Sequence, residues 1–150
     1  MSNFKIFNTN NKASTREKEQ VVNFLFQHLE EYGDEKEDIL KCFNFAVEDS
    51  KKALGGDVLV LQNEEEILGV TIINKTGMEG YIPENILVYI AVHNNARGKG
   101  VGRKIMEKAI EIVDGDIALH VEPNNPAKHL YEKLGFENKY LEMRFKKNKS

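Results

Sequence analysis

The stretch Arg97-Gly98-Lys99-Gly100-Val101-Gly102 lies between a strand-like run and an amphipathic helical pattern. Residues 86–92 (ILVYIAV) precede it; they are mostly apolar or β-branched and too few for a typical helix, so they predict a strand. After it, apolar side chains recur at helical spacing, at Val101, Ile105, Ala109, Ile112 and Val113. Three glycines and two cations therefore occupy a predicted turn from strand to helix.

The turn has the chemistry of a phosphate-binding site. Glycine lets the backbone approach a ligand closely, and the first N–H groups of a helix have no partners inside the helix. These donors and the positive end of the helix dipole attract an anion such as a phosphate. The spacing matches neither a P-loop nor the dinucleotide fingerprint Gly-x-Gly-x-x-Gly. From the turn alone, a glycine-rich turn that only packs a helix against a sheet stays open as the alternative.

Length and composition predict a single domain, residues 1–150, with a substantial core. The hydrophobic fraction of 41% and the charged fraction of 30% are typical of globular proteins. A formal charge of −3 gives no general support for nucleic-acid binding. Cys42 is the one cysteine, which excludes an intrachain disulfide and a multi-cysteine metal site. Because no signal-peptide core or membrane-spanning apolar run is found, we expect a cytoplasmic protein that does not bind membranes.

The remaining patterns predict an α+β fold, with a mixed sheet covered by helices. Strands are expected at residues 4–7, 58–61, 67–73, 117–121 and 141–145. A first helix is expected after the capping box Ser14–Glu17. A second helix is expected to carry Ile39, Phe43, Ala46 and Ser50 inward and to end at Gly55-Gly56. A last helix is expected to begin near Pro126, with Asn124 or Asn125 as its cap, and to end at Gly135.

Residues 124–136 (NNPAKHLYEKLGF) form a second motif, and together with residues 97–102 they resemble the GCN5-related N-acetyltransferase (GNAT) superfamily. Members of this family pair a pyrophosphate turn, Arg/Gln-x-x-Gly-x-Gly/Ala, with a later Asn-x-x-Ala-x-x-Leu-Tyr-x-x-x-Gly-Phe segment. Arg97, Gly100 and Gly102 match the turn. The residues that match the later segment are Asn124, Ala127, Leu130, Tyr131, Gly135 and Phe136.

The resemblance implies a single acetyltransferase domain with a GNAT-like splayed mixed sheet flanked by helices. Two parallel strands, ending near Val92 and Val121, would separate to admit acetyl-CoA as cosubstrate. Strand backbone would pair with the pantetheine arm, the glycine turn would hold the pyrophosphate, and two cations would add charge. For Asn124, which would hydrogen-bond the pantetheine arm, a plain helix cap stays open as the alternative. The resemblance thus implies a set of cofactor-binding residues. This set is Ile90, Ala91, Val92, Arg97, Gly98, Lys99, Gly100, Val101, Gly102 and Asn124.

The implied reaction is direct attack of a primary amine on the thioester, with both substrates bound in a ternary complex and no metal. Tyr131 is the implied catalytic residue, acting on the departing CoA sulfur. Many relatives place a carboxylate on the strand that here contains Val88 and Tyr89, and this sequence has none there. The candidates for the general base are a water molecule or one of the residues near the predicted strand ends. These residues are Glu84, His93, His120 and Glu122.

Two other function classes stay open: a non-catalytic acyl-CoA-binding regulatory domain and a structural module with an empty glycine turn. The missing strand carboxylate favours the first of these, and the matching Tyr131 argues against it. The expected acceptor is a small-molecule or peptide amine rather than a nucleic acid. In relatives, the helix pair that here carries six carboxylates between residues 30 and 38 forms a wall of the acceptor site, so the resemblance favours a small cationic amine. The sequence does not fix the oligomeric state, and a homodimer is one option.

Overall fold

The computed structural model describes residues 1–48 and 53–147. In chain order its elements are β1 (Asn3–Phe7), α1 (Thr15–Leu29), the 3-10 helix η1 (Glu30–Tyr32), α2 (Lys36–Val47), β2 (Gly56–Gln62), β3 (Ile67–Lys75), β4 (Asn85–Val92), the 3-10 helix η2 (Asn94–Ala96), α3 (Val101–Ile112), β5 (Ile117–Leu119) and α4 (Ala127–Lys133). The chain divides into two compact units, Met1–Leu119 and His120–Ser150.

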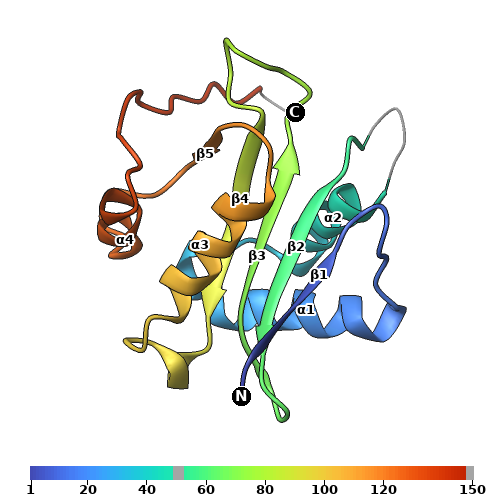
Figure 1. Ribbon diagram of the computed structural model, residues 1–150. Helices are drawn as coiled ribbons and strands as arrows, with labels where there is room; N and C mark the ends of the chain where they lie inside the picture. The colour runs from blue at the N-terminus through green and yellow to red at the C-terminus, as the bar shows by residue number, and fades with distance from the viewer. Residues whose placement is uncertain (49–52, 148–150) are drawn as a thin grey trace. The chain divides into compact units, whose positions relative to one another are not determined.

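The N-terminal unit contains a five-stranded sheet with the order β1-β2-β3-β4-β5 (Figure 1). The first four strands pair antiparallel with their neighbours, and β5 lies parallel to β4. A parallel pair needs a crossover connection, which α3 supplies here. The predicted mixed sheet and its α+β class are therefore confirmed.

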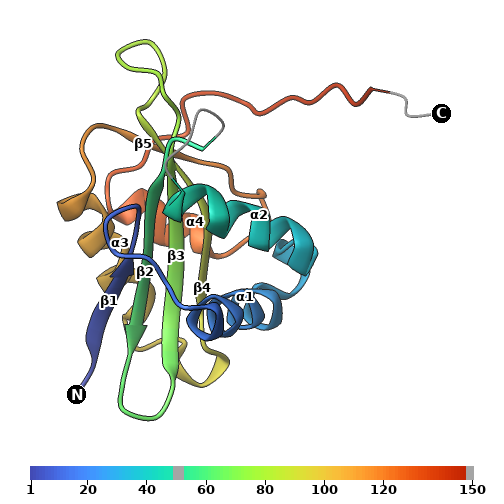
Figure 2. The ribbon, with the colours of Figure 1, turned by 90° about the vertical axis from the view of Figure 1, so that its right-hand side faces the viewer.

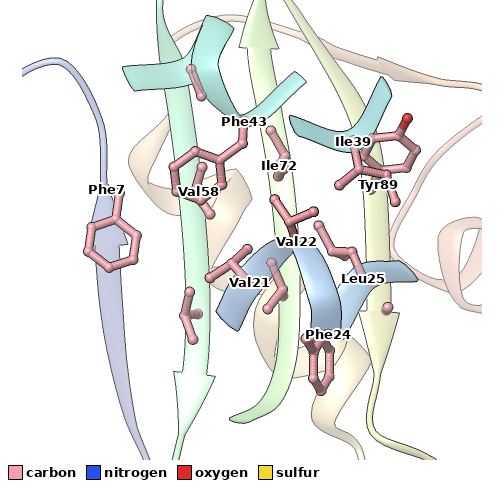
Figure 3. Close-up of a cluster of buried hydrophobic side chains, with 14 of the residues drawn as sticks. Phe7, Val21, Val22, Phe24, Leu25, Ile39, Phe43, Val58, Ile72 and Tyr89 are labelled. Atoms are coloured by element: carbon pink, nitrogen blue, oxygen red, sulfur yellow. The ribbon is translucent and has the colours of Figure 1, made fainter. Parts of the chain in front are cut away.

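Helices cover both faces of the sheet, with α1 and α2 on one face and α3 on the other (Figures 1 and 2). Beneath α1 and α2, Leu25, Phe43 and Ile72 belong to one cluster of buried apolar side chains (Figure 3). On the opposite face α3 packs closely over Gly69, where a Cβ would lie 2.5 Å from Cδ1 of Ile105. The absence of a side chain at Gly69 of β3 therefore leaves room for the Ile105 side chain of α3.

The start of α1 follows the predicted capping box. The Ser14 hydroxyl accepts the Glu17 N–H at 3.1 Å, and the Glu17 carboxylate accepts the Ser14 N–H at 2.8 Å. The predicted end of the second helix was wrong: α2 stops at Val47, because Glu48 already has extended backbone. Gly56, expected as part of the stop signal, begins β2 instead, and Ser50 lies outside the described residues.

The prediction of a last strand at residues 141–145 was also wrong. This segment has no regular secondary structure, and Leu141, Met143 and Phe145 are 82–88% exposed. An alternating apolar pattern favours a strand only when a neighbouring strand supplies the hydrogen-bonding ladder, which a local pattern cannot specify. For the same reason β5 stops at Leu119 and does not extend to Val121.

No helix within the described ranges, 1–48 and 53–147, has both the length and the apolar character needed to cross a bilayer.

Candidate functional site

β4 and β5 separate after a short parallel ladder. The ladder ends at the pair Leu87–Leu119, whereas β4 continues to Val92 and stays paired with β3 along its other edge. Ile90, Ala91 and Val92 thus lie beyond the β4–β5 ladder. This is the splayed geometry that the resemblance implies, and it is the edge at which backbone groups of β4 could pair with a pantetheine arm.

A β-bulge marks the place where the two strands separate. Ile72 of β3 lies opposite Tyr89 and Ile73 lies opposite Leu87, so Val88 is the extra residue of β4. A bulge bends its strand, increases the local twist and is frequent beside active sites. The end of the β4–β5 ladder and the bulge therefore coincide within two residues of Tyr89.

The turn between β4 and α3 contains two glycines with left-handed backbone. Gly98 has φ 79° and Gly100 has φ 78°, a conformation that residues with a side chain adopt only at a cost. A Cβ at either position would meet no heavy atom of the described chain within 4 Å. The space beside this backbone is therefore open, as close approach of a ligand requires.

α3 begins without a side-chain cap. Its N-cap is Gly100, so the first N–H groups of the helix receive no side-chain acceptor, whereas Ser14 and Glu17 cap α1. The first turn of α3 has no acidic residue and instead carries Arg103 and Lys104, although positive charge opposes the helix dipole there. An anion bound at this end would accept hydrogen bonds from the free N–H groups and be attracted by the positive charge nearby.

The two predicted cations of the turn have different surroundings. The Arg97 guanidinium donates to the His28 carbonyl at 2.9 Å and lies 3.5 Å from the Glu30 carboxylate. Glu30 itself has φ 54°, which is unusual for a residue other than glycine. Lys99 is exposed. Arg97 therefore fastens the turn to the end of α1, and Lys99 is the cation more available to a phosphate.

The C-terminal unit carries Tyr131 and Asn124. Tyr131 lies on α4 and is buried, with its ring centroid 6.0 Å from that of Phe136. Burial raises the pKa of Tyr131 to about 12, so the phenol stays protonated and can donate a hydrogen bond. Asn124 is exposed, and the side chain of Asn125 instead accepts the Ala127 N–H at 2.9 Å. The side chain that hydrogen-bonds to the start of α4 is therefore that of Asn125 and not that of Asn124.

Among the candidates for the general base, Glu84 has a clear structural role. Its carboxylate accepts the N–H of Asp116 at 2.7 Å and that of Gly80 at 2.9 Å. These two backbone donors, Asp116 first, hold the pKa of Glu84 below its usual value. Because both donors stabilise the ionised form, Glu84 is a weaker base than an ordinary glutamate.

His93 directly follows β4. Its Nδ1 accepts the Asn95 N–H at 3.1 Å, and its Nε2 lies 3.7 Å from the Glu66 carboxylate. It also borders an open hollow of about 550 Å³ between α1 and the β2–β3 turn. His120 and Glu122 are exposed residues of the C-terminal unit. These three residues and water stay candidates for the base.

The structure also joins two residues that the sequence analysis did not connect. The Tyr89 hydroxyl donates to the Asp34 carboxylate at 2.5 Å, across a separation of 55 positions in the sequence. Asp34 lies between η1 and α2, and Tyr89 lies on β4 beside the bulge. No local pattern links the two; the available signal was the place of Asp34 in the acidic stretch of residues 30–38.

His28, near the end of α1, is a buried histidine. Its burial predicts that the stability of the protein depends on pH. It is 4% exposed, its ring packs at a tilt against those of Phe24 and His93 at centroid distances of 4.5 and 4.4 Å, and its Nδ1 accepts the Asn94 N–H at 3.4 Å. Burial lowers the pKa of His28 below the ordinary histidine value. The native state therefore keeps the ring neutral at a pH where the unfolded chain protonates it.

Stability should fall as the pH drops below about 6.5, by at most ~1.4 kcal/mol per pH unit, because the unfolded chain then binds the additional proton. Denaturant unfolding of the native sequence at pH 7.5 and 5.5 measures this loss. His28→Phe keeps an aromatic ring and should reduce the loss, whereas the exposed control His129→Phe should not. An equal loss in His28→Phe and the native sequence would contradict the assignment.

Within the described residues, no group of three or more His, Cys, Asp or Glu side chains is arranged to hold a metal ion.

Comparison with known proteins gives one family match. The model of the acetyltransferase (GNAT) domain matches residues 55–138 of the chain. No curated protein sequence gives a significant match.

Several solved structures share the fold. A transcriptional regulator from Bacillus halodurans C-125 is 24% identical, with 95% of this chain and 100% of that chain covered and a TM-score of 0.65. A possible acetyltransferase from Clostridium difficile 630 is 18% identical, with 99% of both chains covered and a TM-score of 0.69. The aminoglycoside N-acetyltransferase AAC(6')-Iy in complex with CoA is 14% identical, with 98% and 95% covered and a TM-score of 0.68.

Proposed function

Because the chain belongs to the acetyltransferase (GNAT) domain family, we propose that it transfers the acetyl group of acetyl-CoA to a primary amine. The observation that carries the proposal is the uncapped, glycine-led N-terminus of α3, placed directly after the strand that separates from β5. The family match crosses from the N-terminal into the C-terminal unit, which supports one acetyltransferase domain over residues 1–150.

The proposed cofactor site follows the chain from β4 into α3. Backbone groups of Ile90, Ala91 and Val92 pair with the pantetheine amides, as a neighbouring strand would. The backbone N–H groups of the turn and of the first turn of α3 hold the pyrophosphate, and Lys99 adds charge. Arg97 acts mainly by fixing the turn to α1. The remaining residues of this site are Gly98, Gly100, Val101, Gly102 and, on the pantetheine arm, Asn124.

In the proposed reaction the amine nitrogen attacks the thioester carbon in a ternary complex, the carbon–sulfur bond breaks, and CoA leaves as a thiolate. A primary ammonium has a pKa of about 10.4, so roughly one molecule in 10³ is nucleophilic at pH 7. The proton that the amine loses passes to water or to a nearby base. Tyr131 donates a hydrogen bond to the sulfur as negative charge develops on it, which lowers the barrier to departure.

An assay of acetyl-CoA consumption tests this proposal. The chain is incubated with acetyl-CoA and a panel of small-molecule and peptide primary amines, and thiol release is followed with a thiol reagent. Amine-dependent thiol release supports the acetyltransferase. Tight acetyl-CoA binding without turnover on any amine would favour the non-catalytic acyl-CoA-binding regulator. A chain that neither binds nor consumes acetyl-CoA would contradict both.

A further inference from the structure

Tyr89 of β4, a strand without a carboxylate of its own, holds the carboxylate of Asp34 by a hydrogen bond. Tyr89 is 7% exposed and packs in the cluster beneath α1 and α2, beside Ile39 in Figure 3. Burial and the Asp34 carboxylate both raise the pKa of Tyr89, so the phenol keeps its proton and acts as the donor. One oxygen of Asp34 is thereby held at a defined position on the α1–α2 face of the sheet.

The Tyr89–Asp34 pair lies near the expected position of the acetyl-CoA thioester. The pyrophosphate end of the proposed cofactor site is the turn after β4, and the pantetheine arm runs back along Val92 towards Ile90. The thioester then lies towards Tyr89, where the bulge and the end of the β4–β5 ladder close the opening. Asp34 lies beyond the phenol, so a tyrosine side chain separates its carboxylate from the strand backbone.

Asp34 also differs from Glu30, Glu37 and Asp38, which lie close to cations. Glu30 lies 3.5 Å from Arg97, and Lys41 lies within 4 Å of both Glu37 and Asp38. No Lys, Arg or His of the described ranges forms an ion pair with Asp34, and the residue is exposed. A fixed, solvent-accessible carboxylate without a cation is suited to binding a positively charged group of a ligand.

The carboxylate is better suited to bind a cation than to deprotonate the attacking amine. Proton transfer from an alkylammonium to a carboxylate is uphill by about 6 pKa units, or ~9 kcal/mol, on reference values. An ammonium that stays bound to a carboxylate keeps its proton and is not a nucleophile. The cation at Asp34 must therefore be a group other than the reacting nitrogen.

We infer that Asp34 is a specificity-determining residue that binds a second cationic group of the acceptor. The inference rests on the proposed function and narrows its acceptor to diamines and other small molecules with a cationic group beyond the reacting primary amine. Tyr89 is the positioning residue that holds the carboxylate in place. The same negative charge disfavours acceptors in which a phosphate or a carboxylate occupies this position.

Two acceptors that differ only in the second group test the inference. In 1,4-diaminobutane and 4-aminobutan-1-ol the same primary amine is carried on a four-carbon chain that ends in an ammonium or a hydroxyl. With saturating acetyl-CoA, the native sequence should favour the diamine in kcat/KM by about fivefold, the upper range for an ion pair at an exposed carboxylate. This exceeds the statistical advantage of two equivalent amines.

Asp34→Asn removes the charge and keeps an oxygen that can accept from Tyr89. We expect this variant to lose most of the preference through a higher KM for the diamine, with the affinity for acetyl-CoA unchanged. Tyr89→Phe keeps the Asp34 carboxylate but removes the hydrogen bond that fixes its position, so the preference for the diamine should fall to an intermediate value. Glu35→Gln, at the neighbouring exposed carboxylate, is the matched control and should keep the full preference.

The inference is overturned if the native sequence does not distinguish the two acceptors, or if Asp34→Asn keeps the preference. An equal loss in Asp34→Asn and Glu35→Gln would also overturn it, because that result indicates a general effect of charge. Acetyl-CoA binding without turnover of either amine would exclude diamines as acceptors and overturn the inference. It would not contradict the proposed cofactor site. Failure to bind acetyl-CoA would instead contradict the proposed function.

Discussion

Gly100→Val is expected to weaken acetyl-CoA binding by at least about 100-fold, or ~2.7 kcal/mol, in a chain that still folds. Gly100 is the N-cap of α3, and the space beside its Cα is open in the protein. A branched side chain there would occupy the volume that the pyrophosphate needs in order to reach the N–H groups of the helix. The measurement is calorimetric titration with acetyl-CoA, alongside circular dichroism to confirm folding.

Gly80→Val is the matched control for backbone strain. Gly80 has φ 79°, compared with 78° for Gly100, and a Cβ there also meets nothing within 4 Å. Both variants therefore force a side chain into the left-handed region, at a cost of about 1–2 kcal/mol. Their thermal stabilities should fall by similar amounts, while acetyl-CoA affinity falls in Gly100→Val alone. A folded Gly100→Val variant with unchanged affinity would contradict the pyrophosphate assignment.

Tyr131→Phe is expected to lower turnover at least about tenfold, with acetyl-CoA affinity nearly unchanged. The substitution keeps the aromatic ring and its packing against Phe136 and removes only the hydroxyl. With the pKa of Tyr131 at about 12 and a CoA thiol near 8.5 by analogy with cysteine, full proton transfer to the thiolate is uphill by ~3.5 units, or ~5 kcal/mol. The phenol should therefore act as a hydrogen-bond donor rather than as a complete acid.

Single-turnover kinetics measure the effect of Tyr131→Phe on the chemical step. Tyr140→Phe is the control, because Tyr140 lies in the same C-terminal unit and is 80% exposed. If Tyr131→Phe turned over at the native rate under conditions where chemistry limits it, Tyr131 would have only a packing role.

The parts of the fold that the sequence predicted correctly are those determined by local chemistry. Ser14 and Glu17 define the start of α1 because a capping box needs only residues three positions apart. The turn at Gly98 and Gly100 could be predicted because the strand before it and the helix after it have different hydrophobic periods. The mixed sheet followed from the order of these elements.

The parts that the sequence did not predict depend on contacts between distant residues. The hydrogen bond from Tyr89 to Asp34 and the contact of Arg97 with the His28 carbonyl join α1 and its following loop to the strand and turn of the site. Hydrophobic periodicity contains no information on such pairs. Residues 141–145 show the converse error, because their alternating pattern suggested a strand without indicating any strand to pair with.

Amide chemical shifts test the claim that the N-terminus of α3 binds the pyrophosphate of acetyl-CoA. The ¹⁵N-labelled chain is titrated with CoA and, in parallel, with pantetheine, which lacks the pyrophosphate and the nucleotide. We expect CoA to shift the amide resonances of Gly98, Gly100, Val101 and Gly102, and pantetheine to shift those of Ile90–Val92 and leave the turn unchanged. Saturable CoA binding without any shift at Gly98–Gly102 would contradict the claim.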